Sequence, residues 1–542
     1  MLRVSFFCLF LLYATGLQAQ NYSKDSTIPV LIPMPDQFQP GGGTFRFSNE
    51  TSVILNNANA DKIAWYLKTE VLKTTGIALR IGEKANGPAI FLNLKYKKSD
   101  LDESYHLIIE TNRIVIQASN EKGLFHGVVS LLQILRTTKI KHGIAEIPGC
   151  KITDAPAYAW RGLMLDESRH FFGKEKVKEI LDWMAFYKLN RLHWHLTDEP
   201  AWRLEIKKYP NLALIGGIGN YLDENAPAKY YSQEDIKEII AYAADRFIEI
   251  IPEIDMPGHA TAANRAYPEY SGGGTPEHPE FTFNPGLEKT YSYLTDILKE
   301  TSVLFPSKMI HLGGDEVSFG NEKWKSNTEI ISLMKTKNLK DVKEVEDYFM
   351  KRMADSVFHL NSKLLVWDEM ANAGLPTEKT IMFWWRHDQP RQLRTLMEKG
   401  YRTVLCPRLP LYFDFVQDST HRYGRKWNKL YSPMEDVYNF NAGGFAGNEQ
   451  ELNLIEGIQA NLWTETVPDQ ARLDFLLFPR LAALAESAWT KQKNKNLEAF
   501  KFRLKSHINL YNQVGLYYYD PFQPGQHPET PVKRKKPLNY KD

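Results

Sequence analysis

Short apolar runs alternate with helical stretches between about residue 156 and residue 500, and this alternation constrains the fold most strongly. Helical spacing of apolar residues is found in Lys174–Tyr187, Gln233–Phe247, Thr290–Leu304 and Val345–Leu360. Eight shorter runs are typical of buried strands: Gly162–Asp166, Arg191–Leu196, Glu249–Asp255, Lys308–Gly313, Lys363–Trp367, Thr380–Trp385, Thr403–Cys406 and Gly457–Trp463. Strands that alternate with helices predict a parallel sheet, and eight such units predict a (β/α)8 TIM barrel over residues 156–500.

The residues that precede this region, 20–155, follow a different pattern. Four runs are typical of strands: Thr51–Leu55, Ala89–Leu94, His106–Glu110 and Ile114–Ala118. The last two are joined by a plausible hairpin turn, and Gly123–Leu135 has helical periodicity. Because 542 residues exceed what one compact core usually holds, a separate unit is expected here. The predicted fold class is therefore α/β, a TIM barrel domain preceded by a smaller α+β domain.

The two ends of the chain carry separate signals. Residues 1–19 resemble a signal peptide, with Arg3, the apolar run Phe6–Tyr13 and a small-residue cleavage site that ends at Ala19. The run is too short to span a bilayer, so we expect an exported protein, periplasmic or secreted, without stable membrane insertion. Residues 501–542 are expected to start as a helix and to end in the basic run Lys533–Lys536, to which no function is assigned.

The charge and the cysteine count exclude some classes of partner. Lys and Arg number 67 against 65 Asp and Glu, which offers no electrostatic footprint for nucleic acid. After signal removal only Cys150 and Cys406 would remain. Two cysteines this far apart form neither a disulfide framework nor a zinc signature, and the sequence leaves open whether they pair.

A TIM barrel carries its active site at the carboxyl ends of its strands, and those ends are rich in reactive residue types here. The segments at or just past the strand ends are Asp166–His170, His195–Glu199, Asp255–His259, Asp315-Glu316, Trp367–Glu369, Trp385, Tyr412 with Asp414, and Trp463–Glu465. Nearly every strand thus delivers acids, histidines or aromatics to one rim. A purely structural rim would not be expected to do so.

Asp315 and Glu316 are the first candidates for acid/base chemistry. Two nearby acids whose environments separate their pKa values can hold one proton between them at neutral pH. A regular strand would turn neighbouring side chains to opposite faces, so joint action requires a bend in the backbone. Gly313 and Gly314, immediately before the pair, permit that bend.

His193 and His195 suggest a different class, the metal-dependent barrel hydrolases. They are two residues apart on one predicted strand and would face the same way. Such enzymes need further ligands at later strand ends, but those ends offer Trp, Tyr and acids, and His311 lies upstream of its strand end. These histidines are better explained as core residues or as supports of the site, and neither a metal nor a cofactor is expected.

Five segments together resemble glycoside hydrolase family 20, the β-N-acetylhexosaminidases. They are Arg161–His170, Leu192–Asp198, Pro252–His259, His311-Leu-Gly-Gly-Asp-Glu316 and Gly457–Glu465. They occur in the family's order across roughly residues 30 to 490, and the His-x-Gly-Gly-Asp-Glu segment is highly specific. The second segment continues Asp198-Glu199 where Asp-Asp is common in the family, which is expected to tune activity rather than abolish it.

The resemblance implies an exo-acting, retaining hydrolase of terminal, non-reducing β-linked GlcNAc or GalNAc on glycans or chitooligosaccharides. It further implies substrate-assisted catalysis, in which the 2-acetamido oxygen attacks C1 and forms an oxazolinium ion. Glu316 would protonate the leaving oxygen and then activate water. Asp315 would orient the acetamido N–H and balance its positive charge, so Glu316 should start protonated and Asp315 ionised.

The resemblance assigns roles to the remaining rim residues. Asp198 and His259 would form a relay that tunes Glu316, and Tyr412 would hydrogen-bond the acetamido oxygen. Arg161 would bind the ring hydroxyls O3 and O4. The pocket wall and the acceptors for O4 and O6 would be Trp367, Trp385 (preferred to Trp384), Trp463, Glu465 and Asp414.

Three alternatives stay open at this point. The chain could be a lacto-N-biosidase-like or sulfated-hexosamine-specific member of the same family, although Glu465 argues for a closed monosaccharide pocket. It could be a non-catalytic glycan-binding barrel, although intact Asp315, Glu316 and Tyr412 argue against that. A metal hydrolase is the third. The natural glycan and the oligomeric state are not determined by the sequence.

Overall fold

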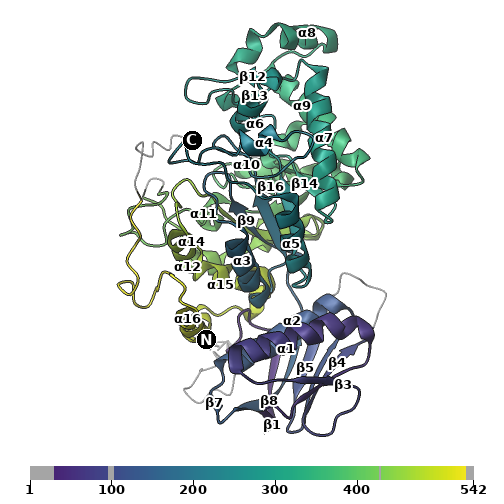
Figure 1. The fold of residues 1–542 in the computed structure, drawn as a ribbon, viewed down its shortest axis with the longest axis vertical. Helices are drawn as coiled ribbons and strands as arrows, with labels where there is room; N and C mark the ends of the chain where they lie inside the picture. The colour runs from purple at the N-terminus through teal and green to yellow at the C-terminus, as the bar shows by residue number, and fades with distance from the viewer. Residues whose placement is uncertain (1–29, 96–102, 427–428, 533–542) are drawn as a thin grey trace, which may run out of the picture.

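The computed structural model describes residues 30–95, 103–426 and 429–532, so the predicted signal peptide and basic tail lie outside it. Its larger part is a closed barrel of eight parallel strands with helices around it (Figure 1). The strands are β9 (Trp160–Asp166), β10 (Arg191–His195), β11 (Glu249–Glu253), β14 (Met309–His311), β15 (Lys363–Trp367), β16 (Thr380–Trp384), β17 (Arg402–Leu405) and β18 (Ile455–Leu462). The order closes β18 onto β9, which confirms the predicted TIM barrel.

The strands formed where continuous apolar runs predicted them, because parallel barrel strands are covered on both faces. Every residue of β9 and of β16 is buried. The predicted helices are present as α3 (Lys174–Phe186), α5 (Gln233–Ala244), α7 (Glu288–Leu304) and α9 (Val342–His359). Ser232 begins α5 with a capping box, accepting from the backbone N–H of Asp235 while the Asp235 carboxylate accepts from the N–H of Ser232.

The N-terminal domain is one mixed sheet with two helices on the face that is turned toward the barrel (Figure 1). The strand order is β1-β8-β5-β6-β4-β2-β3, and the helices are α1 (Asp61–Thr75) and α2 (Glu121–Thr137). The strands are β1 (Gln37–Phe47), β2 (Ser52–Leu55), β3 (Arg80–Gly82), β4 (Ala89–Leu94), β5 (Tyr105–Ile109), β6 (Arg113–Ala118), β8 (Ile144–Asp154) and the short β7 (Ile140–Lys141), which pairs with β8 outside this order. The expected smaller α+β domain before the barrel is therefore confirmed, and the long pair β1 and β8 was not predicted.

The amphipathic helix α2 lies between the N-terminal sheet and the barrel, and it contacts both α3 and the C-terminal helix α16 (Leu497–Gln513). Thirteen consecutive residues of α2, Gly123–Leu135, are buried. Such complete burial indicates that the two domains share one continuous core rather than meeting at a wet interface.

Cys150 and Cys406 are both buried and free, so they do not pair. Among the described residues, no helix combines the length and the apolar character that crossing a bilayer would require.

Candidate active site

A pocket opens at the carboxyl ends of the barrel strands. Its lining consists of Arg169, His259, Asp315, Glu316, Trp367, Trp385, Tyr412, Arg425, Trp463 and Glu465. Eight of these ten residues were predicted from the sequence; Arg169 and Arg425 were not.

The backbone bends after β14, as the two glycines predicted. Gly313 and Gly314 have φ angles of 64° and 88°, and Glu316 itself is left-handed with a φ of 51°. A Cβ atom on Gly313 would lie 1.8 Å from Oδ1 of Asp255, so only glycine fits there. This bend brings Asp315 and Glu316 into the same pocket, whereas a regular strand would have separated them. A non-glycine residue at positive φ carries strain, which is typical of functional sites.

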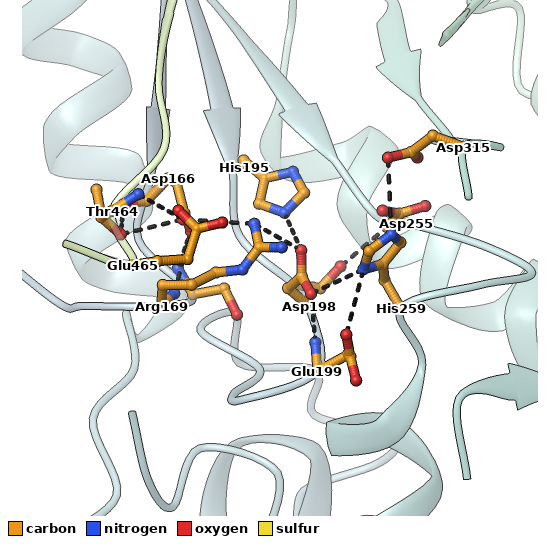
Figure 2. A network of polar contacts seen from close by, with 12 residues as sticks. Asp166, Arg169, His195, Asp198, Glu199, Asp255, His259, Asp315, Thr464 and Glu465 are labelled. Carbon is orange, nitrogen blue, oxygen red and sulfur yellow. Dashed lines mark hydrogen bonds and ion pairs between the residues drawn. The ribbon is translucent and has the colours of Figure 1, made fainter. Parts of the chain in front are cut away.

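Glu316 is the first member of a chain of polar contacts. Its Oε2 lies 3.5 Å from Nε2 of His259. Nδ1 of the same ring donates to Oδ1 of Asp198 at 3.0 Å (Figure 2). His259 Nε2 also lies 3.7 Å from Asp315 Oδ2. Asp198 and Asp255 together with the neighbouring acids hold the pKa of His259 well above its usual value, although burial acts against them. The predicted relay of Asp198, His259 and Glu316 is thus assembled, with His259 as a cation between acids.

Asp198 is fixed from several directions. Arg169 Nη1 lies 2.8 Å from its Oδ2, His195 Nε2 lies 2.9 Å from the same oxygen, and the backbone N–H of Glu199 donates to Oδ1 at 2.6 Å. Burial opposes its charge, but Arg169 and His259 outweigh that and hold the pKa of Asp198 well below its usual range. Asp198 is therefore an ionised anchor, 2% exposed, behind the pocket lining.

The pKa shifts of Asp315 and Glu316 differ in direction from the expectation. Burial, with Glu316 and other acids nearby, raises the pKa of Asp315 to about 8, although His259 counteracts it. Burial also works against the charge of Glu316, but the hydrogen bond and charge of His259 outweigh it, so the pKa of Glu316 is lowered. These shifts favour the proton on Asp315 over Glu316, which is opposite in direction to the arrangement expected from the sequence.

Four aromatic side chains form the pocket wall. Trp385 stacks with Tyr412 at 6.3 Å between ring centroids and 15° between planes, and Trp463 lies 6.1 Å from Trp367. Trp385 is 9% exposed and lines the pocket, whereas Trp384 is 1% exposed and is absent from the lining. The choice of Trp385 over Trp384 therefore agrees with the geometry. Glu369 accepts a hydrogen bond from Trp385 Nε1 at 3.1 Å and fixes the ring.

The opposite side of the pocket is polar. Arg425 lies between two predicted acceptors, with Nε 3.0 Å from Asp414 Oδ2 and Nη2 3.7 Å from Glu465 Oε1. Asp414 is 2% exposed and is not part of the lining, so it supports Arg425 from behind. Burial raises the pKa of Asp414 to about 7, with Arg425 opposing it.

Arg161 does not reach the pocket, so the role expected for it is wrong. It is the second residue of β9 and therefore lies at the amino end of the barrel, opposite the site. Its guanidinium is fully buried and bonds Glu103 of the N-terminal domain at 2.5 Å and the carbonyl oxygens of Lys188 and Tyr158.

Arg169, three residues after the end of β9, lies in the pocket instead. Its guanidinium carbon lies 5.0 Å from the centre of the Trp463 ring, and its side chain is 11% exposed. It belongs to the same sequence segment as Arg161, and its position past a strand end was the signal that could have identified it. Arg425 lies in a loop without any recognised motif, so the sequence offered no comparable signal.

His193, His195 and His311 lie inside the barrel, fully buried, around Glu253. Their contacts are with protein groups, which agrees with their expected role as supports of the site. Donor atoms of His193, His311 and Glu253 lie within 4.8 Å of one another, close enough to be considered for a metal. None of these three residues lines the pocket, whereas another group with donor atoms this close, Asp255, His259 and Asp315, includes two residues that do.

Comparisons with known proteins agree with this geometry. Residues 158–492 match the catalytic domain of glycosyl hydrolase family 20, and residues 29–155 match domain 2 of the same family. A curated β-hexosaminidase of Porphyromonas gingivalis is 32% identical over 530 residues, 94% of this chain and 67% of that protein. Another, from Vibrio furnissii, is 32% identical over 496 residues, 86% of this chain and 79% of that protein.

Solved structures are similar along most of the chain. The exo-β-N-acetylglucosaminidase of Vibrio harveyi in complex with N-acetylglucosamine superposes with a TM-score of 0.83 at 29% identity, covering 91% of this chain and 79% of that one. The β-N-acetylhexosaminidase of Streptomyces coelicolor gives 0.79 at 30% identity, covering 93% and 99%. With both domains matched in order, the chain belongs to glycosyl hydrolase family 20 and is a glycoside hydrolase with β-N-acetylhexosaminidase activity.

Proposed function

We propose that this hexosaminidase is exo-acting and retaining, and that it removes one terminal, non-reducing β-linked GlcNAc or GalNAc by substrate-assisted catalysis. The observation that carries the proposal is the pair Asp315 and Glu316 in one aromatic pocket, with Glu316 linked through His259 to the ionised Asp198. One acid can then work on the leaving group while its neighbour holds the acetamido group.

In the first step the acetamido oxygen attacks C1, and the bond from C1 to the leaving oxygen breaks as Glu316 gives that oxygen a proton. Asp315 accepts a hydrogen bond from the acetamido N–H and balances the positive charge of the oxazolinium ion. The pKa shifts favour the proton on Asp315 before substrate binds, so the proposed step requires that binding favours it on Glu316 instead. An N–H donor against Asp315 stabilises the ionised form and favours that transfer.

In the second step water attacks C1 and reopens the oxazolinium ring, while Glu316 takes a proton from the water. Two displacements at C1 leave the anomeric configuration unchanged. Tyr412, at the pocket wall, would hydrogen-bond the acetamido oxygen and orient it for attack. Trp367, Trp385 and Trp463 would enclose the acetamido methyl and one face of the sugar, since C–H-rich faces pack on aromatic rings.

The exo mode follows from the polar side of the pocket. Arg169, Arg425 and Glu465 line it, and Asp414 supports Arg425 from behind. These charged groups would bind the ring hydroxyls of the terminal sugar, which supports recognition of a non-reducing end. The substrates would be glycans or chitooligosaccharides with terminal GlcNAc or GalNAc. We also propose export to the periplasm or the medium, on the sequence of residues 1–19.

The test uses an aryl β-N-acetylglucosaminide and the purified protein, with NMR of the first-formed sugar anomer. We expect cleavage with retention, and a loss of roughly 10²- to 10⁴-fold in Glu316→Gln on a poor leaving group. Asp315→Asn should lose roughly 10²- to 10³-fold because the acetamido group is no longer held by a charge. An oxazoline-like inhibitor should bind the wild type tightly. Inversion, or turnover unchanged in Glu316→Gln, would overturn the assignment.

Product analysis by mass on oligosaccharides distinguishes the neighbouring specificities. A monosaccharide as the first product supports the exo-hexosaminidase, whereas a disaccharide would indicate a lacto-N-biosidase-like cut. A strong preference for 6-sulfated sugars would indicate the sulfated-hexosamine type. Binding without turnover on any β-hexosaminide would indicate a glycan-binding barrel.

A further inference from the structure

Below the pocket, the barrel interior holds a charged side chain, Glu253, that takes no part in the proposed mechanism. Glu253 ends β11, is fully buried and faces the barrel interior. Its Oε2 lies 2.5 Å from His195 Nδ1, and its Oε1 accepts a hydrogen bond from Trp367 Nε1 at 2.9 Å. His193 and His311 are its other neighbours, at 3.0 and 2.9 Å. One carboxylate thus contacts both the supports of the site and a pocket wall.

His195 lies between two carboxylates. Its Nδ1 faces Glu253 at 2.5 Å, while its Nε2 faces Asp198 at 2.9 Å. An ionised carboxylate can only accept hydrogen bonds, so both ring nitrogens must donate, and a histidine that donates from both nitrogens is a cation. A neutral histidine that only packed in the core would carry a single N–H and could donate one hydrogen bond. The pKa of His195 is raised well above its usual value by Glu253 and Asp198, against the effect of burial.

We propose that Glu253 and His195 are positioning residues for the acid/base Glu316. Glu253 keeps His195 charged, His195 holds the Asp198 carboxylate in place, and Asp198 in turn holds the His259 cation against Glu316. The five groups form one line of alternating charge from the barrel interior to the pocket. Through Trp367 the same carboxylate also fixes the aromatic wall. The inference rests on the proposed function, because it assumes that Glu316 is the proton donor.

Other charged groups bear on this line and must be counted. Asp198 also faces Arg169 at 2.8 Å, and His259 faces Glu199 at 3.9 Å and Asp315 at 3.7 Å. Buried Asp255 also acts on the charge of His259. Aromatic rings cover the remaining sides, with Trp463 4.9 Å from His195 and Phe281 4.8 Å from His259. Arg169 and His259 would still hold Asp198 ionised if His195 became neutral. The loss of Glu253's charge should therefore weaken the proton donor without abolishing it.

The experiment measures kcat and KM for Glu253→Gln on a series of aryl β-N-acetylglucosaminides with different leaving groups. A dinitrophenyl leaving group departs without a proton, whereas a methoxyphenyl leaving group needs the acid. We expect a loss in kcat of about tenfold for methoxyphenyl and less than about threefold for dinitrophenyl, a fraction of what a general acid contributes. A uniform loss for all leaving groups would overturn the inference and leave Glu253 a packing residue.

His193→Gln is the matched control, because His193 contacts Glu253 without touching Asp198. Its losses should not depend on the leaving group. The wild type itself provides a second readout, which is independent of the kinetics. ¹⁵N NMR of labelled histidine, with His195→Gln used for assignment, should show both nitrogens of His195 protonated from about pH 6 to 9. A neutral His195 in that range would overturn the inference. An inactive wild type would instead overturn the proposed function, so the two failures are distinguishable.

Discussion

Two buried charged clusters lie at opposite ends of the same barrel and contain the same kinds of residue. The pocket cluster consists of Arg169, Asp198, His259, Asp315 and Glu316 at the carboxyl ends of the strands. The interface cluster consists of Glu103, His126, Asp154, Arg161 and Lys188, where the N-terminal domain meets the amino ends. Each has an arginine, a histidine and carboxylates, so residue type alone does not separate a catalytic site from a structural one.

The clusters differ in what their polar atoms contact. In the interface cluster each guanidinium nitrogen of Arg161 donates a hydrogen bond, and Lys188 and Tyr105 both bond Asp154, at 3.1 and 2.7 Å, while His126 Nδ1 makes no hydrogen bond within the described residues. In the pocket cluster Asp315 Oδ1 makes no hydrogen bond within the described part of the chain, and Glu316 borders the empty pocket. A closed network stabilises the junction of two domains, while an open one can bind and exchange protons.

Exchanging the two arginines for methionine should separate the clusters most clearly. Arg169→Met should lose roughly 100-fold in kcat/KM, since a hydrogen bond to a charged group contributes about 1.5–3 kcal/mol, and it should also lose stability because buried Asp198 loses its arginine. Arg161→Met should keep the activity of the folded fraction but lose about 3–5 kcal/mol of stability, because it leaves Glu103 buried without its arginine. Steady-state kinetics and urea unfolding measure both. The opposite pattern would reverse the assignment of the two clusters.

Arg161 and Arg169 also show what the sequence could and could not predict. The eight strands were predictable because buried parallel strands are continuous apolar runs, and the pocket then followed from the strand ends. Arg161 was misassigned from the resemblance, although the predicted strand began at the next residue and placed it at the wrong end. The ion pair of Arg161 with Glu103 joins two domains across 58 residues, which no local pattern records. Arg425 and Glu253 were missed for similar reasons, since only the closed barrel brings them to the site.

Raising the pH should act through the pocket cluster on kcat/KM. The pKa of Asp315 is raised to about 8, so the pair keeps one proton below that pH and loses it above. Because the proposed chemistry starts from a singly protonated pair, kcat/KM should fall about tenfold per pH unit above about 8, with folding unaffected there. Asp315→Asn should lack this limb in its residual activity. A wild-type profile that stays flat to about pH 10 would show that the proton does not come from the pair.

Lowering the pH should act through the interface cluster on the free energy of unfolding of the protein. This effect should be smaller than the loss of kcat/KM at high pH. Burial, with the charges of Arg161 and Lys188, lowers the pKa of His126 to about 4, although Glu103 acts in the other direction. Below about pH 6.5 the unfolded chain binds a proton at this histidine, whereas the folded protein binds it only near pH 4. The free energy of unfolding should therefore fall by roughly 2 kcal/mol between about pH 7 and pH 5 from this residue alone.

His126→Gln isolates that contribution, because glutamine can still donate to Glu103 but does not titrate. Urea unfolding of both proteins at about pH 7 and pH 5 should show a steeper loss in the wild type, while kcat per folded molecule stays the same in both. Other buried histidines, His193 and His507, titrate in both proteins and cancel in the difference. Equal losses in wild type and variant would mean that His126 takes up its proton without opening the junction. The interface cluster would then be less closed than its hydrogen bonds indicate, and the contrast with the pocket cluster would rest on Arg161 alone.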